Sequence, residues 1–138
     1  MSKADQQKVL PLLHFQRTVC FGPCPAYSAT ISTDGTVTFA GFAHVPTTDT
    51  LYFKIEPEVM DSINQKISAL NYPSLQDLYP TDWTDMPSTI TTFYKEGKED
   101  KKVIHKEGGP AELREFQEWL DGLLLRLAET TTIKGNLK

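Results

Sequence analysis

The sequence predicts a single α+β domain, in which two amphipathic helices pack on one face of a mainly antiparallel sheet. Three observations predict this class. Short runs rich in Thr, Val, Ile and aromatic residues alternate in polarity, as half-buried strands do. Turn residues separate neighbouring runs closely enough for hairpins. Two longer segments, 57–70 and 110–127, repeat apolar residues at helical spacing. The expected order is β-β-β-β-α-β-β-α.

The first half of the chain contains four of the predicted strands. Asp34 and Gly35 separate the second strand from the third. We expect a type I′ turn there, because both of its central residues need a positive φ, which Asp tolerates and Gly prefers. The four strands are expected over residues 12–19, 27–33, 36–42 and 51–55.

The second half contains both helices and a second hairpin. Pro57 opens the first helix at a position where its missing N–H costs nothing, and the pattern ends before Pro73. The second hairpin covers 88–95 and 101–106, and Gly108-Gly109-Pro110 precedes the last helix. We expect one core that includes Ile31, Phe39, Ile63, Ile67, Ile90, Phe116, Leu120 and Leu124.

Composition limits the class of protein. The 138 residues, 39% hydrophobic and 23% charged, suit one globular domain over 11–128, with a leader at 1–10 and a polar tail at 129–138. A net charge of -4 disfavours a nucleic-acid partner. No run approaches the roughly 18 apolar residues that a membrane span needs. We expect a cytoplasmic protein if the chain is complete, and an extracytoplasmic one if a signal segment has been removed.

The two cysteines lie in the segment Cys20-Phe21-Gly22-Pro23-Cys24-Pro25. The turn between them lets the thiols approach, which leaves three interpretations. The pair is structural, as a disulfide or as two buried thiols; it is a redox-active dithiol; or it binds a soft metal such as Cu(I). One C-x3-C pair does not fit a zinc site, and we predict neither a bound metal nor a cofactor.

Ligand-binding candidates come from Arg17 and from the irregular segment 71–87. Arg17 is an exposed cation, a cation paired with a nearby acid, or a planar fork that holds Asp85 or a ligand carboxylate. Asp82 and Asp85 are turn residues, or they serve acid–base chemistry or a hard cation. Aromatic residues in such a segment are typical of interfaces. The candidates are Arg17, Tyr72, Tyr79, Trp83 and Asp85.

The stretch from Arg17 to Tyr27 reads Arg-x-x-Cys-Phe-Gly-x-Cys-Pro-x-Tyr and precedes a strand, an Asp-Gly turn and another strand. This pattern resembles a bacterial family, domain of unknown function 6438. The similarity extends over about residues 12–127 through Asp85-Met86-Pro87-Ser88 and the closing helix. The resemblance implies an extracytoplasmic or lipoprotein-like setting for many members, and it implies no established activity.

No catalytic motif is present. Ser88 lacks the glycines of a nucleophile elbow, and no lysine–serine pair follows Gly109 as in a P-loop. We therefore predict a non-enzymatic recognition domain that binds a protein or small ligand along the exposed sheet face or under segment 71–87. The alternative is a thiol redox or soft-metal-handling protein that uses Cys20 and Cys24.

Overall fold

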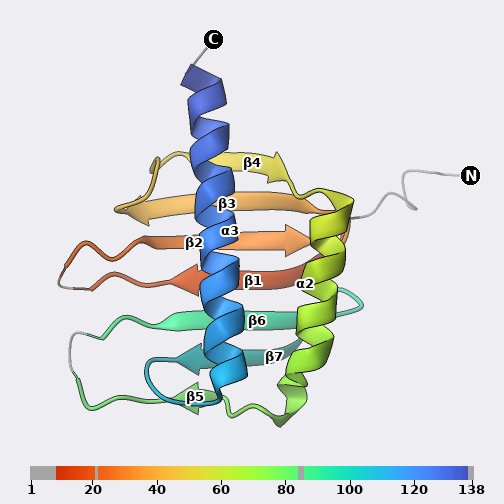
Figure 1. The fold of residues 1–138 in the computed structure, drawn as a ribbon, viewed down its shortest axis with the longest axis vertical. Coiled ribbons are helices and arrows are strands. Elements are labelled where there is room, and N and C mark those ends of the chain that lie inside the picture. Colours follow the sequence, from red (N-terminus) through yellow and green to blue (C-terminus); the bar gives the residue numbers. More distant parts are fainter. Residues whose placement is uncertain (1–8, 21, 84–85, 137–138) are drawn as a thin grey trace, which may run out of the picture.

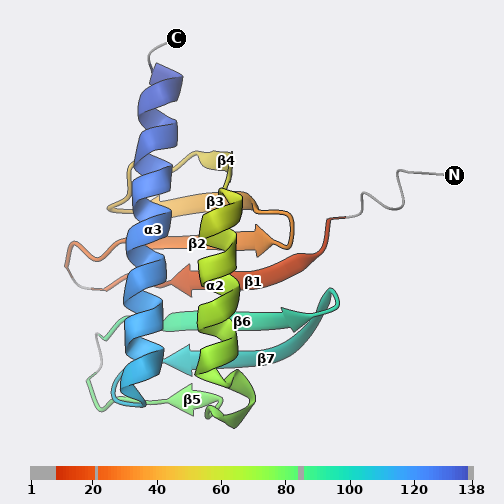
Figure 2. The ribbon, with the colours of Figure 1, turned by 45° about the vertical axis from the view of Figure 1, so that its right-hand side comes forward.

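The computed structural model describes residues 9–20, 22–83 and 86–136. Within these residues, seven strands form one sheet in the order β4-β3-β2-β1-β6-β7-β5. The helices α2 and α3 cover one face of it (Figures 1 and 2). Neighbouring strands are antiparallel, except that β5 runs parallel to β7. The predicted α+β class is confirmed, with a sheet one strand larger than expected.

The strands and helices are as follows. The strands are β1 (Pro11–Arg17), β2 (Ala26–Ser32), β3 (Thr36–Ala43), β4 (Thr50–Lys54), β5 (Leu78–Tyr79), β6 (Thr89–Lys95) and β7 (Lys98–His105). The helices are α2 (Pro57–Leu70), the 3-10 turn η1 (Tyr72–Ser74) and α3 (Ala111–Asn136). Helix α3 continues past residue 128, where the sequence predicted a polar tail to begin.

The core lies between the helices and the sheet face that they cover. Apart from Ile67 and Ile90, the side chains predicted for it are buried there. Ile67 is only partly buried against that core. Ile90 was assigned to the wrong face: Thr91 is the partner of Phe15 and lies in the core row, so Ile90 points to the opposite side of the sheet.

The predicted hairpin between β2 and β3 is confirmed, but its turn type is not. The Gly35 N–H donates to the Ser32 carbonyl at 2.9 Å. Gly35 has φ +93°, whereas Asp34 is not among the residues with positive φ. This is the three-residue arrangement of a turn followed by a left-handed glycine. The type I′ requirement is met instead between β6 and β7, at Glu96 (φ 54°) and Gly97 (φ 82°).

Candidate functional site

One row of residues crosses the sheet at the end where β1 stops and β2 begins. Tyr27 on β2 is the partner of Arg17 on β1, and Arg17 is the partner of Thr89 on β6. Thr89 is the partner of His105 on β7, which is the partner of Tyr79 on β5. Residues directly opposite one another on neighbouring strands share a face of the sheet. This row therefore faces the helices.

Asp121 on α3 joins the first two members of the row. The Tyr27 hydroxyl donates to Asp121 Oδ1 at 2.6 Å. Arg17 Nη1 lies 2.9 Å from Asp121 Oδ2, and both side chains are largely shielded from solvent. The two residues that close the β1–β2 hairpin thus hold the same carboxylate. This contact fixes α3 on the sheet at the base of the cysteine loop.

The environment of Tyr27 favours its neutral form. Burial raises the pKa of the Tyr27 hydroxyl well above its ordinary value, and the neighbouring Asp121 carboxylate raises it further. The positive charge of Arg17 opposes this effect but is the smallest of the contributions. Tyr27 is therefore a fixed hydrogen-bond donor at neutral pH and is not a proton-transfer group.

A pocket of about 190 Å³ lies beside this row. Its walls come from the ends of β1 and β7, the start of β6, the two residues that precede Ser88, and the first turns of α3. The lining residues are Arg17, Met86, Pro87, Thr89, His105, Lys106, Arg114, Gln117 and Glu118. Three of these are cationic and one is anionic. The pocket therefore favours a negatively charged or strongly polar occupant.

Buried donors lie at the pocket without protein partners. Within the described residues, Arg17 Nε and Gln117 Nε2 are inaccessible to solvent and have no hydrogen-bond partner. The Thr91 hydroxyl, two residues after Thr89 on β6, is also buried and has no hydrogen-bond partner among the described residues. Gln117 as a whole is only 6% exposed. Leaving a buried donor unsatisfied costs about 1–3 kcal/mol, so an acceptor that reached these atoms would remove that penalty.

The rim of the pocket is held by hydrogen bonds to the turn before α3. His105 Nε2 lies 2.7 Å from the Gly108 carbonyl. Because a carbonyl only accepts, this nitrogen carries a proton. Arg114 Nη1 donates to the Gly109 carbonyl at 2.8 Å. The turn needs its glycines: Gly109 has φ +80°, and a Cβ there would approach the Tyr79 ring at 3.1 Å.

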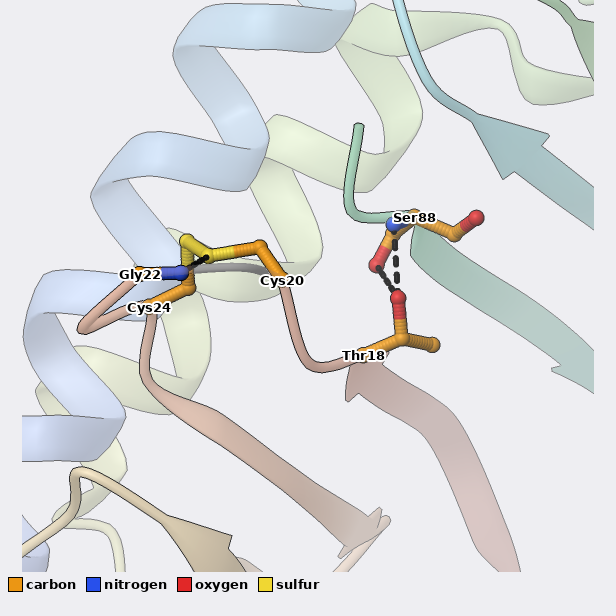
Figure 3. The surroundings of a disulfide bond; sticks show 5 residues. All are labelled: Thr18, Cys20, Gly22, Cys24 and Ser88. Carbon is orange, nitrogen blue, oxygen red and sulfur yellow. Dashed lines mark hydrogen bonds between the residues drawn. A yellow bond between two sulfur atoms is a disulfide. The ribbon is translucent and has the colours of Figure 1, made fainter. Parts of the chain in front are cut away.

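The cysteine loop joins β1 to β2 directly above the Arg17–Tyr27 pair. Cys20 and Cys24 form a disulfide, with their Cα atoms 5.8 Å apart. The Gly22 N–H donates to Cys20 Sγ at 3.2 Å (Figure 3). Close by, the Ser88 N–H donates to the Thr18 hydroxyl at 2.7 Å (Figure 3). The residues before β6 are thus tied to the start of the cysteine loop.

Of the predicted ligand-binding residues, Arg17 lines the pocket. Tyr79 lies in the same row, with its ring centroid 5.8 Å from that of His105, but it is three strands away from Arg17 and is not among the lining residues. Asp85, the predicted partner of Arg17, lies outside the described residues, so that contact stays a prediction.

The other two candidates lie elsewhere. Tyr72 stacks on Phe93, with ring centroids 4.3 Å apart, and donates its hydroxyl proton to Asp100 at 2.6 Å. Hydrogen bonding to that carboxylate raises the pKa of Tyr72 to about 12. Trp83 is 66% exposed and does not line the pocket.

Sequence reasoning missed the residues that complete the site. No role was predicted for His105, and Tyr27 was noted only as the last residue of the stretch that begins at Arg17. Gln117 and Asp121 were overlooked, although they are four residues apart beside the apolar stripe of α3. Polar residues repeated at helical spacing next to a buried stripe are the signal that could have identified them.

Comparison with known proteins identifies the family. The family model described as domain of unknown function (DUF6438) matches residues 11–124, and the chain belongs to this family. No curated protein and no solved structure gives a significant match. Within the described residues, no helix has the length and apolarity that crossing a membrane requires.

Proposed function

We propose that this domain is a non-enzymatic recognition module that binds a carboxylate-bearing small molecule or peptide in the pocket beside Arg17. One observation carries the proposal: Arg17 Nε and Gln117 Nε2 are buried donors that find no acceptor among the described residues. A carboxylate has two acceptor oxygens and suits two such donors. Because both atoms are closed to solvent, binding requires these side chains to shift so that their donors reach the ligand.

The charge of the pocket supports an anionic ligand. Asp121 already neutralises one end of the Arg17 guanidinium through Nη1. Lys106 and Arg114 add positive charge at the rim, and Glu118 is the one acidic residue among the described residues of the lining. A pocket of about 190 Å³ has room for a small organic acid or the acidic side chain of a peptide.

The arrangement supports binding more than catalysis. A general acid or base needs a pKa near the working pH, whereas Tyr27 is held neutral by burial and by Asp121. Arg17 is engaged with Asp121, and His105 uses its Nε2 proton on a backbone carbonyl. These groups position a ligand, and they offer no activated nucleophile.

The competing function is thiol redox or soft-metal chemistry at Cys20 and Cys24. The disulfide is compatible with redox cycling, but a thiolate-stabilising helix N-terminus would favour that role more strongly. Here the loop continues into β2, which is a strand. A disulfide also supports an oxidising compartment. We therefore propose that the pair fixes the loop above the pocket in an extracytoplasmic protein.

Titration with succinate, followed by ¹⁵N NMR, tests the recognition function. The expected result is a saturable shift of the Arg17 Nε–H and Gln117 side-chain amide signals. Gln117→Met should abolish the response. Gln65→Met, at an exposed position on α2, is the matched control and should respond normally. Absence of any shift at about 10 mM succinate, ten times a dissociation constant of ~1 mM, would contradict the proposal.

Two further variants separate the competing explanations. If the Asp85 carboxylate is the natural occupant, Asp85→Asn should strengthen succinate binding by vacating the pocket. The Cys20→Ser/Cys24→Ser double variant should lose about 2 kcal/mol of stability, as expected for so short a loop, and still bind succinate. Unchanged stability combined with lost binding would favour a functional role for the thiols.

A further inference from the structure

Among the residues that the structure describes, β4 forms an edge of the sheet with no strand on its outer side. The Ile55 N–H donates to the Gly35 carbonyl at 2.8 Å, in register with the pairing of β4 and β3. The N–H and C=O groups of the odd-numbered residues of β4 therefore point toward β3. Backbone groups alternate in direction along an antiparallel strand. Those of Thr50, Tyr52 and Lys54 therefore point outward. Tyr52 is also 70% exposed, and the strand Thr-Leu-Tyr-Phe-Lys is rich in residues that favour strands.

Helix α3 extends beyond this edge. Its 26 residues correspond to ~39 Å at ~1.5 Å per residue. A sheet of seven strands spaced by ~4.8 Å is only ~29 Å wide. The helix begins near β5 and its C-terminal end passes β4 (Figures 1 and 2). The excess of ~10 Å is about two strand spacings. The last turns of α3 thus lie above space that one or two further strands could occupy.

A groove lies beside this overhang. In Figure 1 α3 crosses the start of β4, whereas α2 begins beyond the end of β4. Between the two helices, above the second half of β4, is a space of about 410 Å³. Its apolar walls include Phe53, Ile55, Val59, Leu123 and Leu127. A helix end of matching shape would bury these side chains.

We propose that two copies of this chain pair through their β4 edges in antiparallel fashion, about a two-fold axis at Tyr52. In this register Tyr52 faces Tyr52 of the second copy, and Thr50 faces Lys54. Leu51 faces Phe53 of the second copy, so the apolar side chains of both strands lie on the face that the helices cover. Each overhang, whose Thr130, Thr131 and Lys134 also line the groove of their own chain, then lies beside the groove of the other copy.

Charge is compatible with this register. Lys54 meets Thr50 of the second copy, with Asp49 next to it, so no like charges face one another across the new pairing. The pairing is isologous and closes after two copies. It also removes the exposed edge, which a single copy would otherwise present to other chains.

Cysteine cross-linking tests the register. Paired residues on the two-fold axis have Cα atoms ~5.5 Å apart, within the range of a disulfide. Tyr52→Cys should therefore give a covalent dimer under mild oxidation. Thr50→Cys is the matched control: its two copies would lie ~14 Å apart and should not cross-link. Equal cross-linking of both variants, or of neither, overturns the register.

Molar mass measured by light scattering tests the assembly. The native chain should approach twice its monomer mass of 15.5 kDa as concentration rises. Tyr52→Pro removes the outward N–H and should weaken the dimer about tenfold or more. Tyr52→Thr keeps that N–H and should still dimerise. A native mass of 15.5 kDa at ~0.5 mM, or a mass that grows beyond the dimer, overturns the proposal.

Discussion

Replacing Tyr27 with Phe should destabilise the domain by an amount that depends on pH. The ring itself stays packed, because its stacking on Phe39, at 4.9 Å between centroids, needs no hydroxyl. What is lost is the 2.6 Å hydrogen bond to Asp121, and bonds to charged groups contribute about 1.5–3 kcal/mol. Asp121 keeps Arg17 as a partner, so we expect a loss near the lower end, ~1.5 kcal/mol, at neutral pH.

The pH dependence follows from the raised pKa of Tyr27. In the unfolded chain a tyrosine ionises near pH 10, whereas the folded protein keeps Tyr27 neutral. The stabilisation is complete below about pH 10 and falls by ~1.4 kcal/mol per pH unit above it. Denaturant melts at a series of pH values should therefore show the advantage over Tyr27→Phe vanishing near pH 11. A difference that stays constant across this range would refute the reasoning; Tyr52→Phe, at a 70% exposed position, is the control.

Three other perturbations probe the fold. Gly35→Ala should lower the free energy of unfolding more than Gly108→Ala does, although both glycines have positive φ. A Cβ at Gly35 would lie 2.7 Å from the Ile55 carbonyl oxygen, whereas a Cβ at Gly108 would have no atom within 4 Å. The difference between the urea midpoints of the two variants measures the effect of this clash. Leu120→Ala, in the core, should lose about 2–5 kcal/mol in the same assay, and Ile133→Ala, at an exposed position, less than ~0.5. Burial and, to a smaller extent, the charge of Lys102 lower the pKa of His14 below its usual value of 6.5. Protonation below pH 6.5 therefore favours the unfolded chain, and the stability of the native protein should decline as the pH falls. The melting temperature of His14→Gln should fall less steeply over the same pH range.

The elements that the sequence predicted are those encoded by local patterns. Alternation and turn residues identify β2 and β3, and Pro57 marks the first residue of α2. Strand β5 was missed because two residues carry no period, and it is held by pairing with β7. The end of α3 was missed because the apolar stripe stops where the helix passes the edge of the sheet. Beyond β4 there is no core to require apolar residues.

The site was harder to predict because its parts are distant in sequence. The bond between Tyr27 and Asp121 joins residues 94 positions apart. No local pattern reports such a contact, and a lone aspartate on a helix is usually solvated. The cysteine spacing indicated the loop between β1 and β2. The long-range contacts to Asp121, however, are made by Arg17 and Tyr27 at the base of that loop.

The segment from Arg17 to Tyr27 forms one structural unit. Arg17 and Tyr27 are directly paired across the β1–β2 hairpin, and Cys20 and Cys24 close the loop between them. A disulfide there narrows the conformations of the loop, and the hairpin pair then presents two donors to Asp121. Since Nη1 of Arg17 is used on Asp121 while Nε is left free of described partners, the same guanidinium can anchor α3 and still offer a donor to the pocket. If the pocket binds a carboxylate as proposed, loss of Asp121 should affect binding as well as stability, because Arg17 would lose the ion pair that holds it at the pocket wall. Asp121→Asn keeps an acceptor for Tyr27 but weakens the hold on Arg17, so it should reduce succinate affinity more than Tyr27→Phe does. Equal affinities in the two variants would show that Arg17 is positioned by other contacts.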